Sequence, residues 1–294
     1  MQDVETIFTR YQAVRPKMPQ ASTVGHSQDI ASLIDIAGEI DAFIFDAFGV
    51  LNVGEVLIEG ADRRLDELRT RGCAIRILTN AASFDRTHTI AKFHRLGLTV
   101  ADEEIVSSRD ATLLHLDNRH WGVIAAHADR LEDVDFPTMR LGDDMADYRA
   151  VDGFLFLSSE VWSKAQQALL ATAMDENPRP LMIANADLVA PRGTEFSLEP
   201  GYFGHQIAER HTDHVRFFGK PFPEVYTLIE KTLPGIAPSR IAMCGDTLHT
   251  DILGAAARGW RTVLVTQDGL FAGFDTQDFS SRSGLYADWR LARI

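Results

Sequence analysis

The chain has 294 residues, of which 45% are hydrophobic and 24% are charged, a composition typical of a globular protein with a large core or two domains. Its formal net charge of −13 opposes binding to nucleic acid or to an anionic lipid surface and favours a small-molecule partner. No apolar run approaches the roughly 18 residues that a membrane span needs.

The N-terminal segment is polar and acidic, which excludes a signal peptide. Only two cysteines are present, and both lie inside apolar stretches, so a disulfide framework is not expected. These features together predict a cytoplasmic protein without membrane contact.

In chain order, the first forty residues form an extension of unclear role, in which Pro16 and Pro19 interrupt a weak helical pattern. After it, strand-length apolar runs alternate with segments of helical period. A buried strand over 43–45 leads into Asp46. The following predictions are a helix over 60–72, a strand over 74–80, a helix over 86–98 and a strand over 104–108.

The alternation continues to the C-terminus. About ninety residues in the middle predict strands over 121–129, 153–159 and 181–187 with a helix over 161–174. The last third predicts a helix over 221–233, a strand over 240–246, a helix over 250–259 and a strand over 262–269. The fold class is therefore α/β: a doubly wound parallel-sheet core of residues 1–118 and 215–294, with an inserted α/β domain over 119–214.

Asp46 is the first candidate for chemistry. It follows directly on a buried strand and enters a loop that contains Gly49. In an open parallel sheet, ligands bind at the carboxyl ends of the strands, so the position suits a catalytic group. An aspartate that only caps a helix or closes a turn is the structural alternative.

Four more polar residues stand at comparable places. Thr79 ends the second strand with a hydroxyl able to hold an anion, and Lys220 stands just before a helix, where a cation can neutralise phosphate. Asp246 ends a later strand, with Asp251 five residues on, and two carboxylates in one loop suit a hard divalent cation. The residues together are a far stronger indication than any one of them.

The order Asp46, Thr79, Lys220 and Asp246 with Asp251 resembles the four motifs of the haloacid dehalogenase (HAD) superfamily. The segments GVL, LTNA, GKP and GDTLHTDI, and the long gap before GKP, resemble its NagD-like branch, which carries an α/β cap after the third core strand. The segment beginning ANAD resembles the returning cap segment of that branch, usually written with Asn-Pro-Asp, although Ala186 here replaces the proline. The resemblance also implies a homodimer through the caps.

The resemblance implies a hydrolase of small phosphate monoesters. Asp46 would attack phosphorus and form an aspartyl-phosphate. Mg²⁺ would be held by Asp46, Asp246 and the backbone carbonyl of Phe48, with support from Asp251. Thr79 and Lys220 would bind the transferring phosphoryl group.

Two further residues, Asn80 and Asp187, are predicted to contact the substrate. Asn80 follows the motif threonine, and Asp187 lies on the segment that resembles the cap return.

Phe48 departs from the family pattern. HAD phosphatases usually carry a second aspartate there, which protonates the leaving group and then activates water. Either activity on unactivated esters is impaired, or another group substitutes, or the reaction differs. His249 and the cap histidines His127 and His205 are the candidates for that other group, whereas Asp187 is a better-placed candidate for substrate contact.

Two alternatives to a phosphatase stay open at this point. True 2-haloacid dehalogenases have an aromatic residue at this place in a similar FDAFG string, and they need no metal because halide leaves without a proton. A non-catalytic relative that binds phosphorylated ligands is the other alternative. The metal-type loop GDTLHTD and the late cap favour the phosphatase.

Overall fold

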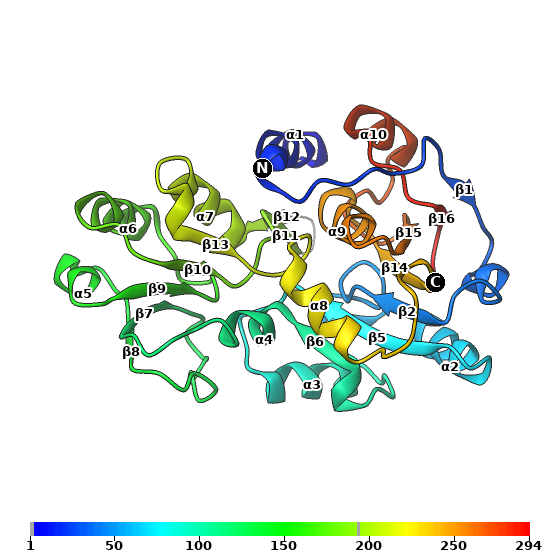
Figure 1. Cartoon of the computed structure of the whole chain (residues 1–294), viewed down its shortest axis with the longest axis horizontal. Helices are drawn as coiled ribbons and strands as arrows, with labels where there is room; N and C mark the ends of the chain where they lie inside the picture. Colours follow the sequence, from blue (N-terminus) through cyan, green and yellow to red (C-terminus); the bar gives the residue numbers. More distant parts are fainter. Residues whose placement is uncertain (1–2, 193–194) are drawn as a thin grey trace.

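Two parallel sheets organise the computed structural model, which describes residues 3–192 and 195–294 (Figure 1). The larger sheet has seven strands in the order β1-β16-β15-β14-β2-β5-β6, and every neighbouring pair is parallel. Its strands are β1 (Gln28–Asp29), β2 (Ala42–Phe45), β5 (Ala74–Thr79), β6 (Ile105–Ser107), β14 (Ile241–Gly245), β15 (Arg261–Val265) and β16 (Trp289–Leu291).

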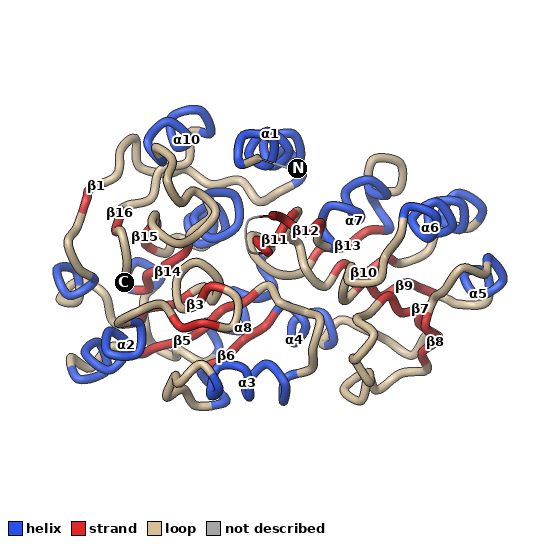
Figure 2. Tube along the Cα trace, turned by 180° about the vertical axis from the view of Figure 1, so that it is seen from behind, coloured by secondary structure: helices blue, strands red, loops and turns tan. Residues whose placement is uncertain are grey.

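Helices cover both faces of this sheet because its central strands are apolar on both sides. All four residues of β2 are buried, and successive side chains point to opposite faces. Phe43 and Phe45 pack with α2 (Ala61–Thr70) and α3 (Arg86–Arg95), whereas Ile44 packs with α4 (Ser108–Leu113), α8 (Pro223–Lys231) and α9 (Leu253–Ala257) (Figures 1 and 2). The predicted doubly wound α/β core is confirmed.

The second sheet has five parallel strands in the order β13-β10-β9-β7-β8. It forms the cap, at the left of Figure 1, together with helices of its own. The cap elements are β7 (Trp121–Ile124), β8 (Thr138–Arg140), α5 (Met145–Arg149), β9 (Gly153–Phe156), α6 (Lys164–Glu176), β10 (Leu181–Ile183), α7 (Pro200–Ala208) and β13 (Val215–Phe217).

The sequence placed the cap boundary between residues 214 and 215, but β13 pairs with β10 of the cap sheet. We therefore propose that the cap domain extends through Phe217 before the chain returns to the core. The hydrophobic clusters support this division, since Val215 packs among cap side chains.

Two hairpins lie near the junction of core and cap. One joins β3 (Asn52–Val53) to β4 (Val56–Leu57) just after Asp46, and the other joins β11 (Val189–Arg192) to β12 (Glu195–Leu198) just after Asp187. The helix predicted over 250–259 begins as a π-helical turn, Leu248–Ile252, and continues as α9. Within the described ranges, no helix is long and apolar enough to cross a membrane.

The N-terminal extension, whose role the sequence did not indicate, contains α1 (Val4–Val14) and β1. The helix lies beside α10 (Thr276–Ser283), above the place where cap and core meet (Figures 1 and 2). Its apolar side joins one cluster with Leu188 of the cap and Leu248 of the core. The extension thus contacts both domains.

Arg109 fastens α4 of the core to the cap. Its guanidinium is 1% exposed, donates to Asp129 at 2.7 Å and to Asp133 at 2.8 Å, and also donates to the carbonyl oxygen of Ala82. Both carboxylates belong to the segment that follows β7.

Replacing Arg109 by alanine should lower the free energy of unfolding by about 3–5 kcal/mol, because the buried carboxylate of Asp129 would lose its counter-ion. Urea denaturation measures the change. Arg149→Ala is the matched control, since Arg149 pairs with Glu176 at the cap surface. Equal unfolding midpoints for the two variants would show that Arg109 does not hold the domains together.

Candidate active site

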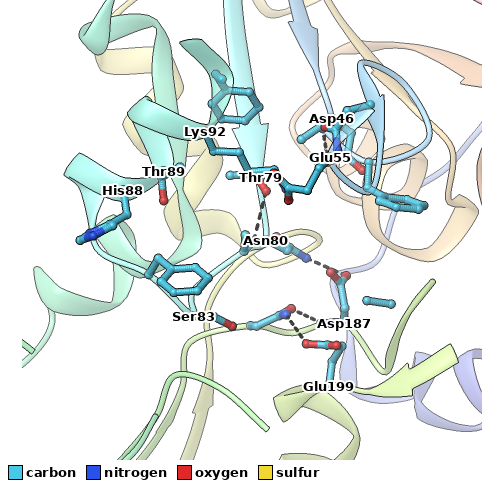
Figure 3. A pocket seen from close by; sticks show the side chains of 18 of the residues that line it. Asp46, Glu55, Thr79, Asn80, Ser83, His88, Thr89, Lys92, Asp187 and Glu199 are labelled. Carbon is cyan, nitrogen blue, oxygen red and sulfur yellow. Dashed lines mark hydrogen bonds and ion pairs between the residues drawn. The ribbon is translucent and has the colours of Figure 1, made fainter. Parts of the chain in front are cut away.

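The cavity of interest lies where the carboxyl ends of β2 and β5 meet the returning cap segment (Figure 3). It has a volume of about 340 Å³. Core residues Asp46, Phe48, Thr79 and Asn80 line one side, and Asp187 of the cap segment lines the other. Because β14 pairs with β2, its own carboxyl end brings Asp246 to the same edge of the sheet.

Three carboxylates converge behind this cavity. Asp46, Asp246 and Asp251 each offer an oxygen, and these oxygens all lie within 4.8 Å of one another. The ammonium group of Lys220, 2% exposed, lies 2.6 Å from Asp46 Oδ1 and 2.8 Å from Asp251 Oδ1. Four residues that the sequence selected from distant segments are therefore brought into one cluster.

The loop after β14 holds its two carboxylates in place. The Thr247 hydroxyl donates to Asp246 Oδ1 at 3.0 Å, and the Leu270 N–H donates to Asp246 Oδ2 at 2.7 Å. The Thr247 N–H donates to Asp251 Oδ2 at 3.1 Å. These bonds fix the carboxylates before any ligand arrives.

The electrostatics of the cluster are dominated by burial. Burial raises the pKa of Asp46 to about 8, and the neighbouring carboxylates of Asp251 and Asp246 add to the rise, although Lys220 opposes it. Burial and Asp251 likewise raise the pKa of Asp246 to about 7. Burial alone would lower the pKa of Lys220, but the surrounding carboxylates outweigh it and raise the pKa. One ammonium does not neutralise three acids at this site.

Thr79 and Asn80 differ in what they offer a ligand. The Thr79 hydroxyl accepts a bond from the Ala81 N–H at 3.1 Å, which leaves its own hydrogen free to donate. The Asn80 amide is already engaged: its oxygen accepts from the Lys220 N–H at 2.6 Å, and its nitrogen donates to the Lys220 carbonyl and to Asp187. Asn80 therefore holds the backbone of Lys220 in place. The sequence predicted only that Asn80 contacts the substrate.

The backbone position directly before Lys220 requires a glycine. Gly219 has a φ of +97°, and a Cβ there would lie 2.6 Å from Asn80 Oδ1. Only glycine avoids both the strained backbone and the clash. The GKP segment thus fixes the lysine through backbone geometry as well as through charge.

Asp187 reaches the cavity from the cap. Its Oδ1 accepts from Asn80 Nδ2 at 2.8 Å, so the cap return is tied directly to the end of β5 (Figure 3). Burial raises the pKa of Asp187 to about 7, although Lys220 and the Asn80 hydrogen bond oppose the rise. The sequence placed Asp187 near the substrate, and the structure places it on the cavity wall.

None of the three histidines suggested by the sequence is among the residues that line the described cavity. His127 is exposed, and His205 is stacked on Phe217 with ring centroids 4.2 Å apart. His249 is stacked on Tyr11 and hydrogen-bonded to Gln12, and burial lowers its pKa to about 3. It therefore packs under α1.

Sequence reasoning did not select several side chains that line the cavity. His88, Lys92 and Arg95 come from α3, and Glu55 comes from the β3–β4 hairpin and lies 3.5 Å from the Lys92 ammonium. The sequence feature that could have identified the α3 residues is their spacing, because positions three and four apart lie on one face of a helix.

Comparisons with known proteins agree with this geometry. Residues 43–134 match the family model described as haloacid dehalogenase-like hydrolase, and residues 217–287 match one described as HAD-hydrolase-like. Chronophin of Rattus norvegicus is 30% identical over 247 residues, which cover 80% of this chain and 79% of chronophin.

The chain belongs to the haloacid dehalogenase-like hydrolases.

Two further relatives narrow its place in that family. Chloroplastic phosphoglycolate phosphatase 1A of Arabidopsis thaliana is 28% identical over 272 residues, covering 84% of this chain and 73% of the relative. A solved structure from Cytophaga hutchinsonii, described as a possible sugar phosphatase, shares the fold with a TM-score of 0.78 at 23% identity, covering 91% of this chain and 98% of that one. The α/β cap that follows β6 is that of the NagD-like branch, and the chain is a HAD-type phosphatase.

The acidic cluster fits the divalent cation that this family implies. Its donors are hard carboxylate oxygens that follow the ends of β2 and β14, which is the ligand type that Mg²⁺ prefers. Burial and the neighbouring carboxylates raise the pKa values of Asp46 and Asp246, so a bound cation would favour their ionised forms.

Replacing Asn80 by alanine should lower the free energy of unfolding by about 1–3 kcal/mol, because the buried Lys220 N–H and carbonyl would lose their partner. Thermal and urea unfolding measure the change. Asn177→Ala serves as the control, since Asn177 is exposed at the end of α6. If the two variants unfold alike, Asn80 does not brace Lys220.

Proposed function

We propose that this HAD-type phosphatase hydrolyses small phosphorylated metabolites, with Mg²⁺ bound, through an aspartyl-phosphate on Asp46. The observation that carries the proposal is the buried contact of Lys220 with both Asp46 and Asp251 at the edge where Asp246 also lies. The lysine favours the charged form of Asp46 and orients it, and a bound divalent cation would add the positive charge that keeps the carboxylate ionised, as a nucleophile needs.

Each residue then has a defined task. An Asp46 oxygen attacks phosphorus, and the phosphoryl group passes to it from the ester oxygen. The Lys220 ammonium, held 2.6 Å from Asp46, and the Thr79 hydroxyl would stabilise the negative charge of the transferring group. Water then releases phosphate and restores Asp46.

The metal would be held by Asp46, Asp246 and the Phe48 backbone carbonyl, with Asp251 supporting the loop. When bound, it supplies the positive charge that draws a phosphate dianion to a protein whose net charge is −13. The Asp251 contact with Lys220 would then keep the lysine directed at the phosphoryl group.

The cavity supports a small substrate. Its volume of about 340 Å³ leaves room for a phosphoryl group and a short leaving group beneath the cap. The named substrate of one relative, phosphoglycolate, is of this size class, and we extend that class to this chain.

Asp46→Asn should abolish turnover of every phosphate ester, because an amide is not a nucleophile. Release of inorganic phosphate measures the loss. Beryllium fluoride, which mimics a phosphoryl group on a carboxylate, should raise the melting temperature of the wild type with Mg²⁺ and leave the variant unchanged. Asp41→Asn is the control, since Asp41 precedes the same strand and pairs with Arg240 at the surface.

Retained turnover in Asp46→Asn would make Asp46 structural and overturn the proposed function.

Chelation should stop turnover, and Mg²⁺ should raise the melting temperature of the wild type but not that of Asp246→Asn, which loses one carboxylate ligand. Calorimetric titration with Mg²⁺ measures the binding directly. Halide release from a 2-haloacid in excess chelator would instead support the dehalogenase alternative, and phosphate binding without either turnover would support the non-catalytic one.

A further inference from the structure

Because the usual second aspartate is absent, no residue at that position can protonate the leaving group. Phe48 lines the cavity at that position, and its side chain can neither give nor accept a proton. An alkoxide is a poor leaving group, and general acid help is typically worth about 10²–10⁴-fold in rate. A phosphatase that acts on alkyl esters therefore needs a proton donor from another element.

The direction of phosphoryl transfer says where such a donor must stand. Attacking and leaving oxygens lie roughly in line through phosphorus. The attacking oxygen belongs to Asp46 on the core side, so the ester oxygen leaves toward the cap side of the same cavity. Asp187 lies on that side, and Figure 3 shows its carboxylate across the Asn80 amide from Asp46.

We infer that Asp187 is the general acid and base that replaces the missing second aspartate, an inference that rests on the proposed phosphatase function. The P–O bond to the leaving group breaks as Asp46 attacks, and the Asp187 carboxyl gives its proton to the departing oxygen, which leaves as an alcohol. The Asp187 carboxylate then takes a proton from the water that attacks the aspartyl-phosphate, and phosphate leaves.

The cap return is held firmly enough for this task. The Asp187 N–H donates to Asn185 Oδ1 at 2.9 Å, and the next N–H, that of Leu188, donates to the Tyr11 hydroxyl at 3.1 Å. The side chain is fixed by Asn80 through Oδ1. Within the described part of the chain Oδ2 has no hydrogen-bond partner, so one oxygen orients the carboxyl and the other is free for the substrate.

The surroundings favour the protonated form that an acid needs. Burial is the main reason that the pKa of Asp187 rises to about 7, and Asp46 and Asp251 contribute to the rise. The charged or titratable groups of the neighbouring elements are Lys220, Asp46, Asp251, Glu199 and Tyr11. Of these, Lys220 is the cation, and it opposes the rise without cancelling it.

The test compares leaving groups in the Mg²⁺-loaded protein. In Asp187→Asn, kcat/KM for an alkyl phosphate such as glycerol 3-phosphate should fall by about 10²–10⁴-fold. With 4-nitrophenyl phosphate, whose leaving group departs without a proton, the fall should be under about fivefold. Glu55→Gln is the matched control, because Glu55 lines the same cavity from the β3–β4 hairpin, and it should leave the ratio of the two rates unchanged.

Two readouts separate a catalytic from a merely structural role. For the wild type, kcat/KM with the alkyl ester should decline as pH rises through about 7, where the raised pKa lets the carboxyl lose its proton, and this decline should vanish in Asp187→Asn. Phe48→Asp added to Asp187→Asn should restore alkyl turnover by at least about tenfold, because it returns the acid to its usual place.

Stability measurements distinguish a catalytic loss from misfolding of the variant. The stabilisation of Asp187→Asn by beryllium fluoride should match that of the wild type, which shows an intact phosphoryl site. If Asp187→Asn does not fold, Asp187→Glu keeps an acid and should retain both alkyl turnover and its decline at high pH.

Two results would overturn the role of Asp187. One is an equal fall in kcat/KM of Asp187→Asn on the alkyl and the aryl ester, and the other is a wild type that hydrolyses only the aryl ester. If the Mg²⁺-loaded wild type hydrolyses neither ester, the proposed function itself is refuted.

Discussion

The Lys220 ammonium, buried between Asp46 and Asp251, is the contact on which the site depends. A buried cation is stable only with close counter-charges, and two nearby carboxylates are stable only with a cation. Each partner therefore makes the other possible. The lysine reaches this place because Gly219 allows an unusual backbone and because Asn80 holds the Lys220 backbone on both its N–H and its carbonyl. Much of the nearby sequence thus serves to position one charge.

The cap completes the site with few polar links. Asn80 joins the end of β5 to Asp187, and Arg109 joins α4 to the segment after β7. Asn80 directly follows β5, and Arg109 is the second residue of α4, so both links start where a core element already fixes the backbone. The cap can therefore bring the Asp187 carboxylate to the cavity that Asp46 lines, although Asp187 lies 66 positions after Trp121, the first residue of β7.

The sequence predicted well what depends on local pattern. The apolar runs that end at Asp46, Thr79 and Asp246 became neighbouring strand ends, because parallel strands align their carboxyl ends. Contacts between distant segments were beyond its reach: Asn80 meets Lys220 across 140 positions, and Tyr11 meets Leu188 across 177. No periodicity encodes such pairs. The environment of His249 has the same origin, since only the packing of α1 shows that its ring is enclosed.

The position of α1 has a consequence for how the phosphatase moves. The helix packs at once on the cap segment at Leu188 and on the core loop at Leu248, so any rotation that separates cap from core must disturb its contacts. A ligand bound between the domains would then stabilise the same arrangement of cap and core as α1 does, and each would strengthen the binding of the other. The backbone amides of residues 4–14 should consequently exchange with deuterated solvent more slowly when a phosphate analogue is bound, although the helix does not itself line the cavity. The N-terminal helix would thus act as a reporter of domain closure.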